Sequence, residues 1–313
     1  MKGLELAQRY FEQVGAPMLT EKFHKYEARI AAGLVGDGSE CFGFDDELSK
    51  DHDWGPSFCI WLNSEDYIRI GMEIQREYEA LPMVFEGYEK IDTKGNDDRR
   101  GVFANEAFYK RFIGLDHPPQ SLQEWRMIPE EYLAVATNGK VFSDPLGEFT
   151  YFREKLKEFY PEDIRLKKIA ARCMTIAQSG QYNYPRCIKR GEYVAAYYSE
   201  AKFVDAVVSM IFLLNKEYKP FYKWMHRAML KLPVLGERIY ELLIDLVAVD
   251  EKETNNFYMR KSNIIEEISM HVINELYRQG LSDHKSDFLW DHGPEVQLRI
   301  QDPIIKGIDV TLD

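Results

Sequence analysis

The chain of 313 residues is 45% hydrophobic and 13% aromatic, a composition that can bury a substantial core and excludes a disordered protein. Its formal net charge of −12 excludes broad nucleic-acid binding driven by the neutralisation of phosphates. The length allows one large domain or two ordinary ones.

Three features predict a cytoplasmic protein. The N-terminal segment MKGLELAQRYFEQ is charged and amphipathic, unlike a signal peptide. The longest apolar run, over 204–214, is interrupted by Asp205 and Ser209 and is too short to span a bilayer, so no membrane partner is expected. The cysteines show no CxxC spacing, and scattered thiols fit a reducing compartment better than disulfides or zinc. They are Cys41, Cys59, Cys173 and Cys187.

The first third of the chain predicts alternating helices and strands. Apolar residues at helical spacing predict helices over 3–14 and 17–28, and IAAGLVG at 30–36 predicts a buried strand. A second strand is expected over 52–62, broken at Gly55-Pro56. A helix over 65–80 ends at Leu81-Pro82, and the segment that begins at Gly101 predicts another strand.

From residue 124 onward the apolar pattern has long helical periods. Apolar stripes predict helices over 203–214 and 265–276, and Pro220 favours the start of a helix over 221–230. Alternation near the end of the chain predicts two short strands, over 296–300 and 307–312. The expected fold class is α+β, with a catalytic half in residues 1–120 and a mostly helical half in residues 121–313.

A glycine-serine turn and an aspartate pair are the most informative feature of the chain. Gly38-Ser39 follows the first expected strand, and Asp51-His52-Asp53 comes after a spacer of eleven residues. Side chains alternate along a strand, so Asp51 and Asp53 are expected on one face and His52 on the other. Two adjacent carboxylates suit a divalent metal that holds nucleotide phosphates, and the turn offers amides and a hydroxyl to phosphate oxygens. Asp45 and Asp46, in the spacer, are expected to be solvated.

This arrangement resembles the signature of the nucleotidyltransferase superfamily, which has the DNA polymerase beta fold. That signature is an apolar residue, Gly, Gly or Ser, a spacer of about ten residues, and Asp-x-Asp. The resemblance implies that Asp51 and Asp53 hold Mg²⁺ and that Gly38 and Ser39 contact the nucleotide. It also implies a mixed-sheet catalytic domain over 1–120 and a helical domain that binds substrate or nucleotide over 121–313.

Three longer strings are similar to the bacterial domain-of-unknown-function family 4037. They are GLVGDGSECFGFDDELSKDHDWGP, SGQYNYPRCIKRGE and LLNKEYKPFYKWMHRA, which together lie between about residues 30 and 230. That family is counted among the nucleotidyltransferases, and its members resemble the aminoglycoside adenylyltransferases in layout. The resemblance does not supply the substrates.

A third carboxylate is harder to find. In the related adenylyltransferases it lies in a short strand that reads Val-Glu-Val, whereas the corresponding stretch here is Val102-Phe103-Ala104. The general base is therefore unassigned. Glu106 is the catalytic candidate, with Asp97 and Asp98 as further ones, and a solvated surface acid is the competing interpretation for each.

Triphosphates also need cations, and the helical half offers Lys202 and Lys223 as phosphate contacts. Lys223 lies in an aromatic run, Phe221-Tyr222-Lys223-Trp224, which favours a held ammonium group. Ordinary ion pairs are the competing interpretation for both lysines.

The leading hypothesis is a Mg²⁺-dependent nucleotidyltransferase that moves NMP, with AMP from ATP expected, onto a hydroxyl of a small-molecule acceptor. One alternative is transfer to a protein or to an RNA 3′ end. Another is a non-catalytic sensor of Mg²⁺-nucleotide, which the missing third carboxylate would explain. The expected partners are a nucleoside triphosphate and an acceptor that the sequence does not identify.

Overall fold

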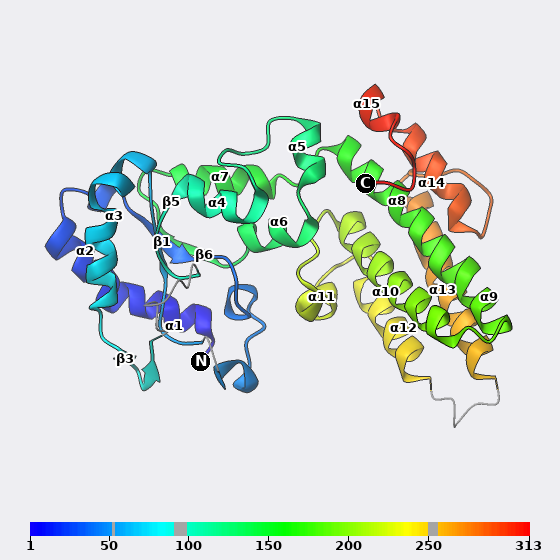
Figure 1. The fold of residues 1–313 in the computed structure, drawn as a ribbon, viewed down its shortest axis with the longest axis horizontal. Coiled ribbons are helices and arrows are strands. Elements are labelled where there is room, and N and C mark those ends of the chain that lie inside the picture. The colour runs from blue at the N-terminus through cyan, green and yellow to red at the C-terminus, as the bar shows by residue number, and fades with distance from the viewer. Residues whose placement is uncertain (52–53, 91–98, 250–255) are drawn as a thin grey trace. The chain divides into compact units, whose positions relative to one another are not determined.

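The computed structural model describes residues 1–51, 54–90, 99–249 and 256–313 (Figure 1). The chain forms two compact units, one of residues 1–120 and 128–158 and the other of residues 121–127 and 159–313. The first unit contains a mixed sheet and the second is built of helices, so the predicted α+β class is confirmed.

The first unit is organised by a four-stranded sheet of order β5-β2-β1-β6. Its strands are β1 (Ala31–Leu34), β2 (Cys59–Leu62), β5 (Gly101–Ala104) and β6 (Lys140–Ser143). β2 and β5 are parallel, whereas β1 is antiparallel to both β2 and β6. Every residue of β1 and β2 is buried, as expected for strands that are covered on both faces.

One face of the sheet packs against the N-terminal helices. These are α1 (Gly3–Tyr10), the π-helical segment η1 (Phe11–Gly15), α2 (Ala16–Phe23) and α3 (Ser64–Glu79). Ile60 and Leu62 point from β2 into this core, together with Tyr10 and Tyr78. The predicted helix over 17–28 ends at Phe23 and is followed by a short 3-10 turn, η2 (Glu27–Arg29).

The other face packs against α4 (Asn105–Ile113) and α7 (Glu148–Lys157), with α6 (Glu130–Thr137) beside α4. Trp61 points to this side, where its ring stacks on Phe149 at a centroid distance of 3.8 Å. A small hairpin, β3 (Val84–Phe85) and β4 (Tyr88–Glu89), follows α3 and was not expected from the sequence.

The division between the units lies later than the predicted boundary at residue 120. β6 pairs with β1, so residues 128–158 belong with the sheet. Between residues 120 and 158, only residues 121–127, which include α5 (Leu122–Met127), belong to the second unit. A strand that pairs with a partner about a hundred residues earlier leaves no local signal of that pairing.

The second unit consists of helices around two long, buried ones. Besides α5, its elements are α8 (Glu162–Ile176), the π-helical η5 (Ala177–Asn183), α9 (Tyr184–Lys189), α10 (Tyr193–Asn215), α11 (Tyr222–Met229), α12 (Gly236–Ala248), α13 (Phe257–Arg278), α14 (Leu289–Leu298) and α15 (Pro303–Lys306). The apolar stripes predicted over 203–214 and 265–276 are buried in α10 and α13, which confirms both helices. α8 packs against α10 and α14 (Figure 1).

The two strands predicted at the end of the chain are wrong. Residues 296–298 lie within α14, and residues 307–312, which follow α15, form turns and irregular structure. Asp302 caps α15 by accepting hydrogen bonds from the amides of Ile304 and Ile305, at 2.9 Å each. An aspartate before a proline is a strong helix-start signal, and it outweighed an alternation only a few residues long.

Among the helices that the structure describes, none combines the length and the apolar run that crossing a bilayer requires.

Candidate functional site

The glycine-rich turn after β1 adopts a conformation that suits its glycines. Gly36 and Gly38 have φ values of +116° and +120°. Asn138 holds the turn from the segment before β6: its Oδ1 accepts from the Gly36 amide at 2.9 Å, and its Nδ2 donates to the Gly36 carbonyl at 2.8 Å. A Cβ atom on Gly38 would lie 2.5 Å from the Glu40 carboxylate oxygens. This turn therefore requires glycine at position 38.

Several backbone amides of the turn are available to a ligand. Within the described part of the chain, the amides of Asp37, Gly38 and Ser39 donate no hydrogen bond, and the Ser39 hydroxyl makes none. Ser39 is half-buried, so its hydroxyl is not simply a solvated surface group. Consecutive amides of this kind form a concave site that favours anions, phosphate above all.

The sheet topology brings other segments to the same edge as this turn. Gly33 of β1 pairs with Cys59, where β2 begins, and Cys59 pairs with Gly101, where β5 begins. Leu34 pairs with Lys140, the first residue of β6. The residues that follow β1 and those that precede β2, β5 and β6 therefore share one edge of the sheet.

Two arginines lie at this edge, and sequence reasoning did not select either. Arg100, just before β5, is 4% exposed; it forms an ion pair with Glu40 and donates to the Asp37 carbonyl at 2.9 Å. Arg111, in the last turn of α4, pairs with the Asp37 carboxylate at 2.5 Å. The Asp37–Arg111 pair is partly exposed, so the cation is accessible beside the turn. The doublet Arg99-Arg100 directly before an expected strand was the signal available in the sequence.

Two cysteines, Cys41 and Cys59, lie near the turn, but their thiols are poor nucleophiles because they stay protonated. Burial raises the pKa of the Cys59 thiol to about 11 and also raises the pKa of Cys41. Both thiols are therefore uncharged at neutral pH, which argues against a cysteine nucleophile here. All four cysteines of the chain are free thiols.

Asp51 does not lie on a strand as predicted. Asp51 is exposed and ends a 3-10 segment, η4 (Glu47–Asp51), and β2 begins only at Cys59. Residues 54–58 form no strand, so the strand predicted over 52–62 is confirmed only over 59–62, and the argument from alternating side chains does not apply to Asp51. Asp53 and His52 lie outside the described residues, as do Asp97 and Asp98. The metal-binding role of Asp51 and Asp53 stays a prediction.

Asp45, in the spacer, is buried rather than solvated. It is 3% exposed and accepts hydrogen bonds from the Gly3 amide at 2.7 Å and from Trp54 Nε1 at 3.2 Å. These bonds tie the spacer to the start of α1 and to the segment that leads into β2. Asp45 therefore fixes the path of the chain on both sides of the aspartate pair.

The structure does not bring Glu106 to the glycine-serine turn. Glu106 lies in the first turn of α4 and accepts a hydrogen bond from the Ser64 hydroxyl at 2.8 Å. Leu62 and Ala104 pair at the carboxyl ends of β2 and β5, so Glu106 follows the opposite edge of the sheet. Phe103 is half-buried, and its ring centroid lies 5.8 Å from that of Phe108. The role predicted for Glu106 finds no support in this arrangement.

Lys202 and Lys223 lie in the second unit, and each contacts an aromatic ring. The Lys202 ammonium lies 5.1 Å from the Tyr198 ring centroid on α10, and that of Lys223 lies 5.3 Å from Trp224 on α11. Both lysines are exposed. Each cation is thus positioned by its neighbour yet open to solvent, and its phosphate-binding role stays a prediction.

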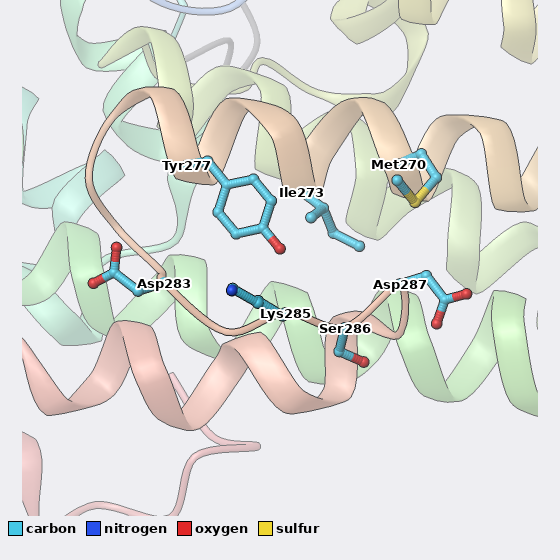
Figure 2. Close-up of a pocket in the computed structure, with 7 residues that line it drawn as sticks. All are labelled: Met270, Ile273, Tyr277, Asp283, Lys285, Ser286 and Asp287. Atoms are coloured by element: carbon cyan, nitrogen blue, oxygen red, sulfur yellow. The ribbon is translucent and has the colours of Figure 1, made fainter.

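The second unit also has a pocket of about 470 Å³ that contains no residue predicted from the sequence. Tyr277 and Ile273 point from α13 toward the loop that precedes α14 (Figure 2). The Tyr277 hydroxyl donates to the His284 carbonyl at 2.5 Å, so its polar end is already used by the loop. Among the residues that the structure describes, no group of three or more His, Cys, Asp or Glu side chains is placed to hold a metal ion.

Comparison with known proteins identifies one family. Residues 125–225 match the family model described as "Domain of unknown function (DUF4037)", which confirms the predicted resemblance over that stretch. No curated protein matches the chain at a significant level. The chain is similar to a solved nucleotidyltransferase-like protein from Exiguobacterium sibiricum 255-15, with 10% identity and a TM-score of 0.37, over 87% of this chain and 81% of that one. The similarity to the DUF4037 family therefore covers residues 125–225.

Proposed function

We propose that the protein is a Mg²⁺-dependent nucleotidyltransferase that moves NMP, with AMP from ATP as the expected case, onto a hydroxyl of a small molecule. The observation that carries the proposal is the turn at residues 36–39, whose three consecutive amides and Ser39 hydroxyl are open to an anion. A turn built around Gly38 allows phosphate oxygens to approach the backbone closely.

The residues around the turn suit a nucleotide triphosphate. Amides 37–39 and the Ser39 hydroxyl would donate to phosphate oxygens. Arg111 lies beside them, partly exposed, and adds positive charge where phosphate charge accumulates. Arg100 is buried behind the turn, where its bonds to Asp37 and Glu40 hold the loop in shape.

The donor chemistry of Asp51 and Asp53 fits magnesium, which prefers carboxylate and phosphate oxygens. Asp51 is exposed, and the segment that contains both acids leads into β2 at the same edge as the turn. Bound Mg²⁺ would neutralise charge on the transferred phosphoryl group. The acceptor hydroxyl oxygen forms a bond to the α-phosphorus, pyrophosphate leaves, and the hydroxyl proton passes to water or a base.

A non-catalytic sensor of Mg²⁺-nucleotide is the second candidate. It is favoured by Phe103, which stands where the third carboxylate was expected, and by Glu106, which follows the opposite edge of the sheet, because no described acid then takes the role of the third carboxylate. Transfer to a protein or to an RNA 3′ end is the remaining alternative for the acceptor. A location in the cytoplasm is part of the same proposal.

Labelled ATP separates these possibilities. The full chain is incubated with Mg²⁺, ATP labelled at the α-phosphate and a panel of hydroxyl-bearing metabolites, and then with cell lysate followed by RNase or protease. If the protein is a transferase, labelled adducts form, and the amount formed falls at least about 100-fold in Asp53→Asn and in Asp51→Asn. Asp116→Asn, which removes an exposed acid paired with Lys110, serves as the control and should leave transfer unchanged. Binding of ATP with no adduct in any pool supports the sensor, and absence of both binding and transfer overturns the proposal.

A further inference from the structure

Three cations of the second unit contact the same residue, Asp313. Asp313 Oδ2 lies 3.0 Å from Arg172 Nη2 and 3.5 Å from Lys168 Nζ. Arg126 Nη1, from α5, donates to the Asp313 backbone oxygen at 3.2 Å. Figure 1 shows residue 313 beside α8, the helix that contributes both Lys168 and Arg172. We call Arg126, Lys168 and Arg172 the cation cluster.

The cation cluster is held in place by groups other than Asp313. Lys168 is 4% exposed, and its ammonium lies 5.1 Å from the Tyr160 ring centroid. Arg172 Nε donates to the Ser209 hydroxyl on α10 at 2.8 Å, which fixes the plane of the guanidinium group. Cations that are already oriented and partly desolvated bind an anion more tightly than solvated ones, because little freedom is lost on binding.

The electrostatics of the cluster favour an anion strongly. Although burial by itself raises the pKa of the Asp313 carboxyl, Arg172 and Lys168 bring it below its ordinary value. Lys167, the neighbour of Lys168, is also buried and donates to the Asp309 carbonyl at 2.7 Å and to Gln297 at 2.8 Å. The Asp309 carboxylate accepts from Thr311, whereas the Asp313 carboxylate contacts the cluster directly.

Arg172 also lines a pocket, so a ligand held there would contact this member of the cluster. The pocket, of about 410 Å³, lies between α8 and α10 and is lined by Arg172, Thr175, Tyr198, Lys202 and Asp205, among others. Lys202 supplies a second cation there, and Lys219 pairs with Asp205 at 2.7 Å and neutralises it. The exposed Tyr198 ring offers a flat apolar surface next to these cations.

We propose that Arg126, Lys168 and Arg172 form a binding site for a phosphate group, and that the Asp313 carboxylate occupies this site as an internal competitor. A phosphate group has more oxygens than a carboxylate and can bond the Arg172 fork and the Lys168 ammonium together. The site lies wholly within the second unit, so it does not depend on the transferase proposed for the turn at residues 36–39. Binding there displaces the segment that follows α15.

The test compares the full chain with Asp313→Asn by calorimetric titration of inorganic pyrophosphate and, separately, of ATP without added metal. Asp283→Asn is the matched control, because it removes an exposed carboxylate that is likewise paired with an arginine, Arg299, at 2.7 Å. We expect pyrophosphate to bind Asp313→Asn about tenfold more tightly than the natural chain or the control, because the competitor has lost its charge. Adding Arg126→Gln to Asp313→Asn should reverse most of this gain.

The change in affinity is compared between pyrophosphate and ATP. Equal tightening for pyrophosphate and ATP identifies the phosphate group as the ligand, and tightening for ATP alone identifies a nucleotide; either result supports the site. Unchanged affinity for both ligands in Asp313→Asn overturns it, as does a gain that persists when Arg126→Gln is added. Thermal melting of each variant verifies that it is folded. Since the titration needs no transfer, its failure leaves the proposed enzyme activity untouched.

Discussion

Glu40 and Arg100 form an ion pair directly behind the Gly38 turn, with 7% and 2% of their side chains exposed. The pair joins the segment after β1 to the segment before β5, some sixty residues apart in the chain. Arg100 also donates to the Asp37 carbonyl at 2.9 Å. The shape of the turn that would bind phosphate therefore depends on a buried charge pair that contributes no ligand of its own.

Removing one charge of this pair should destabilise the first unit. In Glu40→Gln the Arg100 guanidinium is left buried without its countercharge, which costs about 3 to 5 kcal/mol in comparable sites. Urea denaturation should show this loss in the transition of the first unit. Glu47→Gln, which removes an acid whose side chain is 89% exposed, is the control and should shift the midpoint little. A Glu40→Gln protein as stable as the control would show that the pair contributes nothing net.

Substitutions at Gly43 and Gly38, which both have positive φ, distinguish the cost of backbone strain from the cost of steric crowding. Gly43→Ala puts a Cβ where nothing lies within 4 Å, so it costs only the strain of φ +70°, about 1 kcal/mol. Gly38→Ala combines φ +120° with a Cβ 2.5 Å from the Glu40 carboxylate. We expect the Gly38 variant to lose more stability and also to lose ATP binding, measured by calorimetry, whereas Gly43→Ala keeps binding. Normal ATP affinity in Gly38→Ala would place the nucleotide elsewhere.

The Ser39 hydroxyl should matter to binding and little to stability, because it makes no hydrogen bond within the described residues. Ser39→Ala should weaken the affinity for Mg²⁺-ATP about tenfold, the worth of a hydrogen bond to a charged group. Ser262→Ala, on α13, removes a hydroxyl that only donates to the Tyr258 carbonyl and provides the control. Equal affinities in the two variants would remove Ser39 from the site.

The sequence predicts that Glu106 is catalytic, whereas the structure places it at the edge of the sheet opposite the turn. Its hydrogen bond to Ser64 at the far edge of the sheet leads us to expect that Glu106→Gln retains nucleotidyl transfer within about twofold. Steady-state rates with labelled ATP measure this. A fall of about 100-fold, at unchanged melting temperature, would restore Glu106 as the catalytic carboxylate.

Lys167 should give the second unit a distinctive pH dependence. Burial lowers the pKa of its ammonium group from 10.5 to about 8. Between these values the unfolded chain holds the proton and the folded chain does not, so the free energy of unfolding should rise with pH. The rise amounts to about 3 kcal/mol across this window. Below pH 8 both states are protonated and this contribution is constant.

The measurement is a series of denaturant titrations from pH 7 to above pH 10, with Lys167→Met as the comparison. Buried tyrosines act in the opposite direction, since burial raises the pKa of Tyr78 and Tyr109 while unfolded tyrosine ionises near pH 10. The difference between the natural chain and Lys167→Met isolates the lysine. Parallel curves for the two proteins would mean that Lys167 keeps its ordinary pKa.

Local pattern alone was sufficient for much of the fold. The apolar runs of β1 and β5 and the helical stripes of α3, α10 and α13 are readable because each element encodes its own period within a few residues. The Gly38-Ser39 turn was likewise readable, since glycine and serine after a buried strand specify a turn by themselves. The family resemblance was readable over residues 125–225 for the same reason, as it consists of contiguous strings.

Tertiary structure decided what depends on partners distant in sequence. Strand β6 joined the sheet through β1, Arg100 met Glu40, and Glu106 was carried to the edge opposite the turn, none of which any local window contains. The helices at the end of the chain also depend on distant partners. Their short alternating pattern is compatible with a strand or a helix, and both α14 and α15 pack against α8. The sequence by itself thus determined the elements with a clear local period and where the turn lies, whereas long-range pairing determined the rest of the sheet and which charges surround the turn.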